Sequence, residues 1–251
     1  MKTELAEPES GNRFLHKKDS CTEPDTKNLL THGTHNQQDF YVKIDFEDFM
    51  RSKPQFSIKD ETSDVGPVGL FGFGLTTILL SLSNSEVYPV SSVVFSMGAL
   101  VGGLAQIIAG FFEWYKNKFF TAIVFLLYGF FWMSFVLIMI LPAMGLAPPP
   151  DDVGLGTYLF LWAIISAAFT LAAIKRSPQV VILVFITAVI TLVLLAVQNW
   201  TNNVKTGKVA GAIGTICGIL AVYCGIAELV NMAWGFTIFP LEFVKREQKK
   251  I

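Results

Sequence analysis

Charged side chains are scarce over most of this 251-residue chain. The sequence has 19 lysines and arginines and 20 aspartates and glutamates, yet only twelve of these residues lie between Pro67 and Val244. A soluble domain carries about a quarter of its residues as charged side chains. The scarcity therefore argues against a soluble globular enzyme. The net charge of −1 argues against a nucleic-acid-binding protein, which would present a basic face.

Residues that carry metal or nucleophilic chemistry are also missing from the apolar part of the chain. All three histidines lie before residue 36, so the remaining sequence contains no paired histidines with metal-ligand spacing. The three cysteines, Cys21, Cys217 and Cys224, do not build a disulfide framework. The glycine-rich stretch from Gly69 to Gly74 lacks the preceding strand and the following lysine of a phosphate-binding loop. We therefore expect no enzyme activity, no metal site and no cofactor.

The first 66 residues are polar and contain no long apolar run, so we expect no secretory signal among them. Their composition predicts that residues 1–63 form a largely disordered cytoplasmic tail. Residues 40–58 interleave aromatic and aliphatic residues with charged ones. That pattern fits a short amphipathic helix on a membrane surface, and equally a disordered segment with a few docking aromatics.

The rest of the chain alternates long apolar runs with short breaks. An α-helix needs about 17–25 apolar residues to cross a bilayer. The breaks combine charged residues with residues that stop helices, and the runs lack the two-residue alternation of barrel strands. We predict an all-α polytopic membrane protein with a bundle of six transmembrane helices over residues 64–240 and a basic C-terminal tail over residues 241–251. The six runs lie near residues 67–83, 90–112, 119–141, 153–174, 178–198 and 209–231.

Basic residues in the breaks predict the orientation, because short cytoplasmic loops carry an excess of lysine and arginine. With the N-terminus inside, eleven basic residues fall in inner segments, whereas only Lys205 and Lys208 fall in outer loops. We therefore predict that both termini are cytoplasmic, where the basic C-terminal end meets anionic membrane lipid.

Small residues recur at four-residue spacing in the second and sixth runs, as at Gly98 and Gly102 and at Gly214 and Gly218. Small residues allow helix backbones to approach closely in lipid. This pattern fits tight packing within one bundle, and it also fits an oligomer interface or a narrow pore wall. We predict that oligomerisation uses these faces. Replacing Gly98 or Gly214 with leucine would then break assembly.

Polar residues within the apolar runs are few, and each is informative because a charged group near hydrocarbon usually faces a cavity or a partner. Glu113 and Glu228 lie near the ends of their runs, where they are either hydrated at the interface or turned into the protein. Gln106 lies well inside the second run, which favours a hydrogen-bonding role within the bundle. It stands seven residues before Glu113 on nearly the same helix face.

Two aromatic and two hydroxyl residues within the runs also allow more than one interpretation. Tyr128 and Trp132 lie four residues apart on one face of the third run, and Tyr128 is too central for an interfacial aromatic belt. Thr76 and Thr77 either bond to carbonyls of their own helix or face a pore.

Three segments follow one another in the apolar part: PVGLFGFGLTT at 67–77, GGLAQIIAGFFE at 102–113 and YGFFW at 128–132. In this order and spacing they resemble the acetate uptake transporter family, the six-helix succinate–acetate permeases of microbes. The resemblance runs from about Asp64 to Pro240. It implies a six-helix protomer, a homohexamer and one monocarboxylate pathway in each protomer. It also implies movement of acetate and other small carboxylates such as succinate, with protons or down a gradient, across the plasma membrane.

The resemblance also assigns candidate residues. The family's apolar constriction corresponds to Phe73 and Tyr128, with a third residue in the fifth helix, for which Ala188 is our candidate. The family signature before the first helix has Asn-Pro where this chain has Asp64-Val65, and an acid here either repels a carboxylate or carries a proton. The predicted substrate-binding or coupling residues are Asp64, Thr76, Thr77, Asn84, Gln106, Glu113, Trp132 and Glu228.

Two other functions stay open on sequence grounds. The same fold also suits a passive carboxylate or anion channel. A membrane signalling protein that works through its N-terminal tail is the second alternative.

Overall fold

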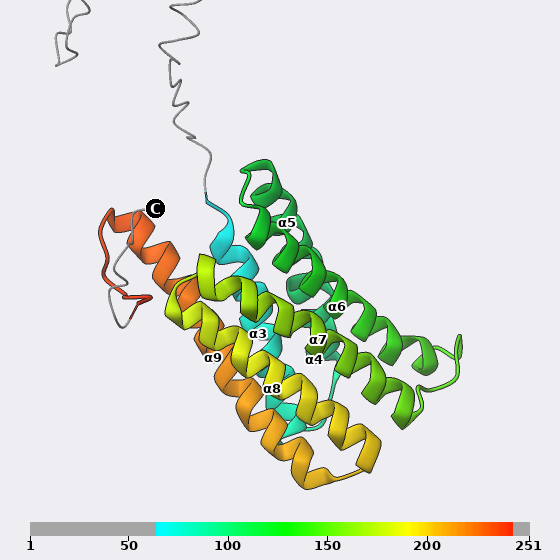
Figure 1. The fold of residues 1–251 in the computed structure, drawn as a ribbon. Helices are drawn as coiled ribbons and strands as arrows, with labels where there is room; N and C mark the ends of the chain where they lie inside the picture. Colours follow the sequence, from blue (N-terminus) through cyan, green and yellow to red (C-terminus); the bar gives the residue numbers. More distant parts are fainter. Residues whose placement is uncertain (1–63, 243–251) are drawn as a thin grey trace, which may run out of the picture. The chain divides into compact units, whose positions relative to one another are not determined.

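The computed structural model describes residues 64–242, and all regular structure within that range is helical. Residues 1–63, with the predicted amphipathic segment 40–58, lie outside the described residues, as do residues 243–251. Six helical stretches are long and apolar enough to cross a membrane, as predicted. Figure 1 shows them as α3 (Gly66–Asn84), a composite of α4 (Ser92–Met97), η2 (Gly98–Ala105) and α5 (Gln106–Tyr115), then α6 (Phe119–Ala143), α7 (Asp152–Arg176), α8 (Gln179–Thr201) and α9 (Val204–Trp234).

The predicted breaks end and start the helices by local chemistry. The Asp151 side chain accepts a hydrogen bond from the Gly154 N–H at 2.7 Å and so caps α7. Asn203 caps α9 in the same way through the Lys205 N–H at 3.0 Å. Asn202, with φ of 50°, adopts the left-handed conformation that ends α8. The short polar breaks of the sequence therefore become sharp turns between long helices.

The second helical stretch contains a feature that its sequence did not predict. Its middle turns, Gly98–Ala105, form a π-helix between two α-helical ends. Here the backbone of η2 comes close to α3, because a Cβ added to Gly72 would lie 2.6 Å from the Val101 carbonyl oxygen. Glycine at position 72 permits this approach, and π-helical turns are frequent at functional sites.

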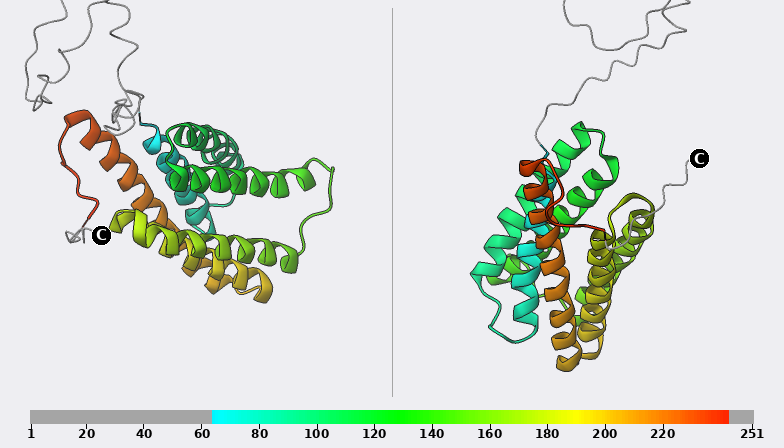
Figure 2. Two further views of the ribbon diagram at one scale, coloured as in Figure 1. Left: turned by 45° about the horizontal axis from the view of Figure 1, so that its top comes forward. Right: turned by 90° about the vertical axis from the view of Figure 1, so that its left-hand side faces the viewer.

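The helices form two groups of three that join through α3 and α9. Helix α3 packs along α9 and against η2 and α5, and α5 and η2 pack against α6. Helices α7, α8 and α9 pack as successive antiparallel neighbours, whereas α6 and α7 barely touch. Figure 2 shows α7, α8 and α9 together on one side of the contact between α3 and α9, and α3 to α6 on the other. Space for cavities therefore lies between the groups.

The glycine faces of the second and sixth runs pack inside this protomer. A Cβ on Gly218 would lie 2.7 Å from the Gly74 carbonyl oxygen, so α9 and α3 meet backbone to backbone. Gly98 and Gly214 are also buried, and a Cβ on Gly98 would lie 2.8 Å from Val136 Cγ2. Our prediction that Gly98 and Gly214 mediate oligomerisation is therefore wrong, because neighbouring helices of the same chain already cover them.

Candidate functional site

Two cavities lie along opposite ends of α3 and share two wall residues, Phe73 and Tyr128. The larger, of about 850 Å³, surrounds the start of α3, and we call it the charged vestibule because Asp64, Glu113, Lys118, Arg176 and Glu228 line it. The smaller, of about 200 Å³, follows the second half of α3 and reaches α6, α7 and α8. We call it the uncharged vestibule, since none of the described residues that line it is acidic or basic.

The shared wall is an aromatic cluster. The ring centroids of Phe73 and Tyr128 are 5.0 Å apart, and Phe169 and Phe185 lie 5.6 and 6.4 Å from Tyr128. The buried Tyr128 hydroxyl donates to Ser166 Oγ at 2.9 Å, which fixes the ring against α7. Ala188, one turn beyond Phe185 on α8, lines the uncharged vestibule. Phe73 and Tyr128 thus belong to the walls of both cavities, whereas Ala188 lines only the uncharged one.

The uncharged vestibule contains polar groups that are mostly bonded within their own helices. Thr77 Oγ1 donates to the Phe73 carbonyl at 2.6 Å, and Asn199 Nδ2 donates to the Leu195 carbonyl at 2.8 Å. Predicted residues Asn84 and Trp132 also line this cavity. The buried Trp132 Nε1 has no hydrogen-bond partner within residues 64–242.

Thr76 does not belong to either cavity. Its side chain is fully buried, and its hydroxyl donates to the Gly72 carbonyl at 2.9 Å with the Met97 carbonyl 3.4 Å away. The hydroxyl is thus used mainly within its own helix, the first of the two roles that we considered for it, and a contact of Thr76 with substrate stays a prediction.

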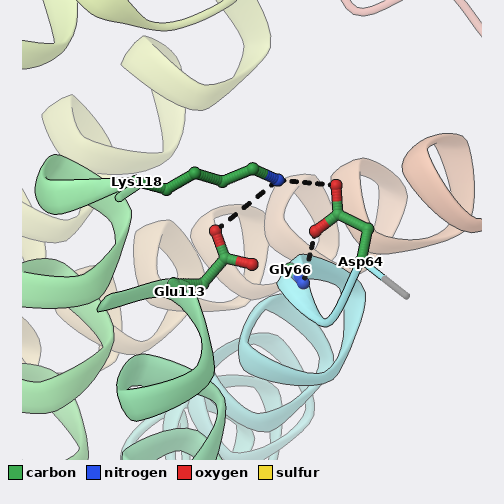
Figure 3. Close-up of polar contacts among 4 residues, drawn as sticks. All are labelled: Asp64, Gly66, Glu113 and Lys118. Carbon is green, nitrogen blue, oxygen red and sulfur yellow. Dashed lines mark hydrogen bonds and ion pairs between the residues drawn. The ribbon is translucent and has the colours of Figure 1, made fainter. Parts of the chain in front are cut away.

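A lysine and two carboxylates meet at the start of α3 (Figure 3). Lys118 Nζ lies 2.6 Å from Asp64 Oδ2 and 3.7 Å from Glu113 Oε2. Asp64 Oδ1 also accepts a hydrogen bond from the Gly66 N–H at 3.3 Å, at the first residue of α3. Glu228 on α9 is close by, since a Cβ on Gly66 would lie 2.9 Å from its Oε2. Three segments that are distant in sequence, around Asp64, around Glu113 and Lys118, and around Glu228, thus form one charged group.

The pKa values of Asp64 and Lys118 respond to this pairing. Partial burial works to raise the pKa of Asp64, but the bonds from Lys118 and Gly66 outweigh it and hold the pKa below its ordinary value. Burial likewise works to lower the pKa of Lys118, and Asp64 and Glu113 together raise it. Both side chains are therefore charged at neutral pH.

Gln106 and Glu113 are the buried polar residues of the charged vestibule. Gln106 is 0% exposed, and neither atom of its amide has a hydrogen-bond partner among the described residues. Glu113 is 1% exposed, and its Oε1 likewise lacks a partner in that part of the chain. A buried polar atom without a partner costs about 1–3 kcal/mol. Partners that come from the contents of the cavity would remove this cost.

Sequence reasoning missed several residues of the site. Arg176 was interpreted only as a signal of orientation, and Lys118 only as such a signal or as a structural partner of Glu113, although both line the charged vestibule. Phe169 and Phe185 are indistinguishable in sequence from other phenylalanines of the apolar runs. A charged residue directly at the end of an apolar run, as at Lys118, is the one signal that was available.

Within residues 64–242, six helices long and apolar enough to cross a membrane, with two cavities that share Phe73 and Tyr128 as wall residues, define a multi-pass membrane protein of the kind expected for a transporter or channel. The chain belongs to the GPR1/FUN34/yaaH family, whose sequence model matches residues 47–243. This confirms the resemblance found in the sequence.

Relatives with informative names include the succinate-acetate/proton symporter SatP of Escherichia coli strain K12, 37% identical over 70% of this chain and 93% of its own length. Ammonia transport outward protein 2 of Saccharomyces cerevisiae is 34% identical over 66% of this chain and 62% of its own length. The solved structure of the bacterial acetate channel SatP superposes with a TM-score of 0.70 at 36% identity, over 72% of this chain and 99% of that one. These relatives are transporters and channels, in agreement with our expectation that the chain is not an enzyme.

Proposed function

We propose that the chain transports acetate and other small monocarboxylates across a membrane, with succinate as a further substrate. The observation that carries this proposal is the Phe73–Tyr128 pair, which forms a shared wall of two cavities at opposite ends of α3. The names of the bacterial relatives support the choice of substrate, because one is a succinate-acetate/proton symporter and the other an acetate channel.

The constriction suits a small acid that sheds water or charge as it crosses. Burying an ionised carboxylate among aromatic rings is costly, whereas a protonated acid carries no net charge. Gln106 offers both a donor and an acceptor to a carboxyl group in either form, and both atoms are without a protein partner in the described range. In this proposal Phe73, Tyr128 and Ala188 set the width of the path. Thr77, Asn84 and Trp132 contact the substrate in the uncharged vestibule.

We further propose that transport is coupled to protons. Glu113 is the leading candidate for the proton-accepting group, because its carboxylate is almost fully buried beside the path and one oxygen lacks a protein partner in the part that the structure describes. Glu228 on the facing helix is the second candidate, and the protonated substrate itself is the third. The name of the solved relative favours the alternative, a passive acetate channel.

The proposal also covers the membrane, the orientation and the oligomeric state of the protein. The basic residues of the loops support cytoplasmic termini, which makes the charged vestibule the inner one. We place the protein in the plasma membrane as a homohexamer. Apolar side chains such as Leu100 and Leu171 are exposed on the protomer and suit contact with lipid or with other subunits. Residues 1–63 and 241–251 are then cytoplasmic tails on either side of the transport domain.

Purified protein in liposomes tests the proposal directly. Labelled acetate, lactate and succinate are offered with and without an imposed pH gradient, and empty liposomes give the background. Faster acetate uptake under an inward proton gradient indicates symport, after allowance for the leak of acetic acid through empty liposomes. Uptake that follows the acetate gradient alone indicates a channel. Absence of protein-dependent acetate uptake would show that the transport proposal is wrong.

The signalling alternative has its own test. A chain without residues 1–63 is expected to keep the full acetate flux, because every residue that we place on the path lies at or after Asp64. Loss of flux in a correctly assembled truncated protein would mean that the tail takes part in transport.

A further inference from the structure

The charged vestibule holds a carboxylate that belongs to the chain itself (Figure 3). Asp64 Oδ2 lies 2.6 Å from Lys118 Nζ, and Asp64 Oδ1 accepts from the Gly66 N–H at 3.3 Å. All three residues line the vestibule. An ammonium group and a backbone N–H at the start of a helix are donors that bind any carboxylate. The substrate class that we propose carries the same chemical group as Asp64.

Glu113 provides an independent observation that this place receives a ligand. Its Oε2 lies 3.7 Å from the same Lys118 Nζ, while its buried Oε1 has no hydrogen-bond partner within the described range. A carboxyl group that arrives with its proton would supply the missing donor to Oε1. Glu113 also keeps Lys118 paired when Asp64 leaves it, so displacement of Asp64 does not strand the lysine.

The Asp64–Lys118 pair is open to exchange. The side chains of Lys118 and Asp64 are 44% and 38% exposed, in contrast to Glu113. Exposed ion pairs contribute little net free energy, because water competes for both partners. A second carboxylate that enters the vestibule therefore competes for Lys118 with a partner that is held only weakly.

Other charged groups face the same space and set its balance. Glu228 comes from α9 and Arg176 ends α7. Three carboxylates and two cations line the vestibule, so a free anion that enters finds no surplus of positive charge. Arg176 and Lys118 are the cations that such an anion meets, and Lys118 is the one that two carboxylates already share.

We propose that Lys118 is the carboxylate-binding residue of the charged vestibule and that Asp64 is a tethered competitor, which the substrate displaces. The inference rests on the proposed function, because it takes a small carboxylate as substrate. Asp64 weakens binding at this end of the path and takes back Lys118 when the substrate departs. This chain therefore releases substrate readily on the side of the charged vestibule.

The test compares the two faces of the protein in vesicles of known orientation. The half-saturating acetate concentration is measured at each face, and a tag before Met1 identifies the face on which α3 begins. Asp64→Asn keeps an oxygen for the Gly66 N–H but frees Lys118 of its charged partner. We expect it to lower the half-saturating concentration at the charged-vestibule face about threefold, in keeping with a weak exposed pair, and to leave the other face unchanged. Asp64→Glu keeps the charge and is expected to lower the half-saturating concentration less than Asp64→Asn does.

A double-mutant cycle identifies the lysine as the group for which Asp64 competes. Lys118→Gln is expected to raise the half-saturating concentration at the charged-vestibule face, and Asp64→Asn then to have no further effect. Lys118→Arg replaces Lys118→Gln if the latter does not assemble, because it keeps a cation beside Glu113. In that background Asp64→Asn still lowers the half-saturating concentration.

A second ion pair provides the matched control. Glu86 Oε2 lies 2.6 Å from Lys208 Nζ with similar exposure, and neither residue lines either vestibule. Glu86→Gln is expected to change neither face. The inference is overturned if Asp64→Asn leaves the charged-vestibule face unaltered, if Glu86→Gln has the same effect, or if the Asp64→Asn effect persists in Lys118→Gln. Absence of acetate transport by the wild-type protein would instead refute the proposed function.

Discussion

The two vestibules differ in where their polar groups find partners. In the uncharged vestibule Thr77 and Asn199 bond to carbonyls of their own helices, so their positions are set locally. In the charged vestibule Lys118 bonds to Asp64, 54 residues away, and Gln106 has no partner in the described part of the chain. In the proposed function the first cavity is therefore a largely preformed wall that selects molecules by size, with Trp132 Nε1 as its polar atom without a partner among the described residues. The second offers groups that can change partner, so we place the binding of the carboxyl group there.

Opening the constriction should have the largest effect, because it removes the boundary between the vestibules. Phe73→Ala or Tyr128→Ala deletes one ring of the pair and joins the two cavities. We expect the flux of lactate relative to acetate to rise about tenfold, since small differences in size at an apolar constriction are worth at least that much. The measurement is uptake of both acids by liposomes. Phe130→Ala is the control. Phe130 lies on α6, as Tyr128 does, but its side chain is exposed on the surface of the protomer. Unchanged selectivity in both variants would place the constriction elsewhere.

Removing the buried charge of the charged vestibule should have the next largest effect. Glu113→Gln keeps the size of the side chain and leaves Lys118 with Asp64 as its partner. If Glu113 carries the coupled proton, acetate uptake becomes insensitive to an imposed pH gradient, while Glu86→Gln keeps the wild-type response. A retained pH response in the assembled Glu113→Gln protein would make Glu113 structural. Coupling would then depend on Glu228 or on the protonated substrate.

The close packing of α3 against α9, which joins the two groups of helices, can be tested by substitution. Gly218→Leu forces a side chain into the space now taken by the Gly74 carbonyl oxygen. We expect the protomer to lose about 1–3 kcal/mol of stability or more, as for overpacked cores. Thermal unfolding in detergent measures the loss. Ala212→Leu adds the same bulk at an exposed position of α9 and should change little. Equal stability of the two variants would mean that α3 and α9 can separate without cost.

The smallest effect concerns the stability that the Asp64–Lys118 pair contributes. The pKa of Asp64 is lowered in the folded protein, so its contribution is present at pH values above about 4, the ordinary pKa of aspartate. It is lost as the pH falls through the lowered pKa. Because the pair is exposed, we expect less than about 1 kcal/mol. The unfolding midpoints of wild type and Asp64→Asn should therefore differ slightly at pH 7 and approach each other as the pH falls below the ordinary pKa of aspartate. A difference that grows on acidification would contradict this assignment.

The sequence alone was enough for the helices and for several residues that line the two cavities. Apolar runs of about 20 residues without strand alternation leave only helices as a way to satisfy the backbone in lipid, and the structure has six such helices. Gln106 and Glu113 stood out because polar residues are rare in these runs, and both are buried beside one cavity. Such inferences succeed because they depend on composition and on local hydrogen bonding.

Only the tertiary structure decided which of two similar residues lines a cavity and which packs between helices. Thr76 and Thr77 are neighbours, yet a helix turns about 100° per residue, so Thr77 lines a vestibule while Thr76 packs against η2. The glycines of α9 have the spacing of a subunit interface but lie against α3 of the same chain. In the sequence Lys118 is a charged residue in a short loop, and only the fold places Asp64 beside it. The sequence of one helix carries its periodicity, whereas the identity of the surface that it faces depends on contacts with helices far away in the chain.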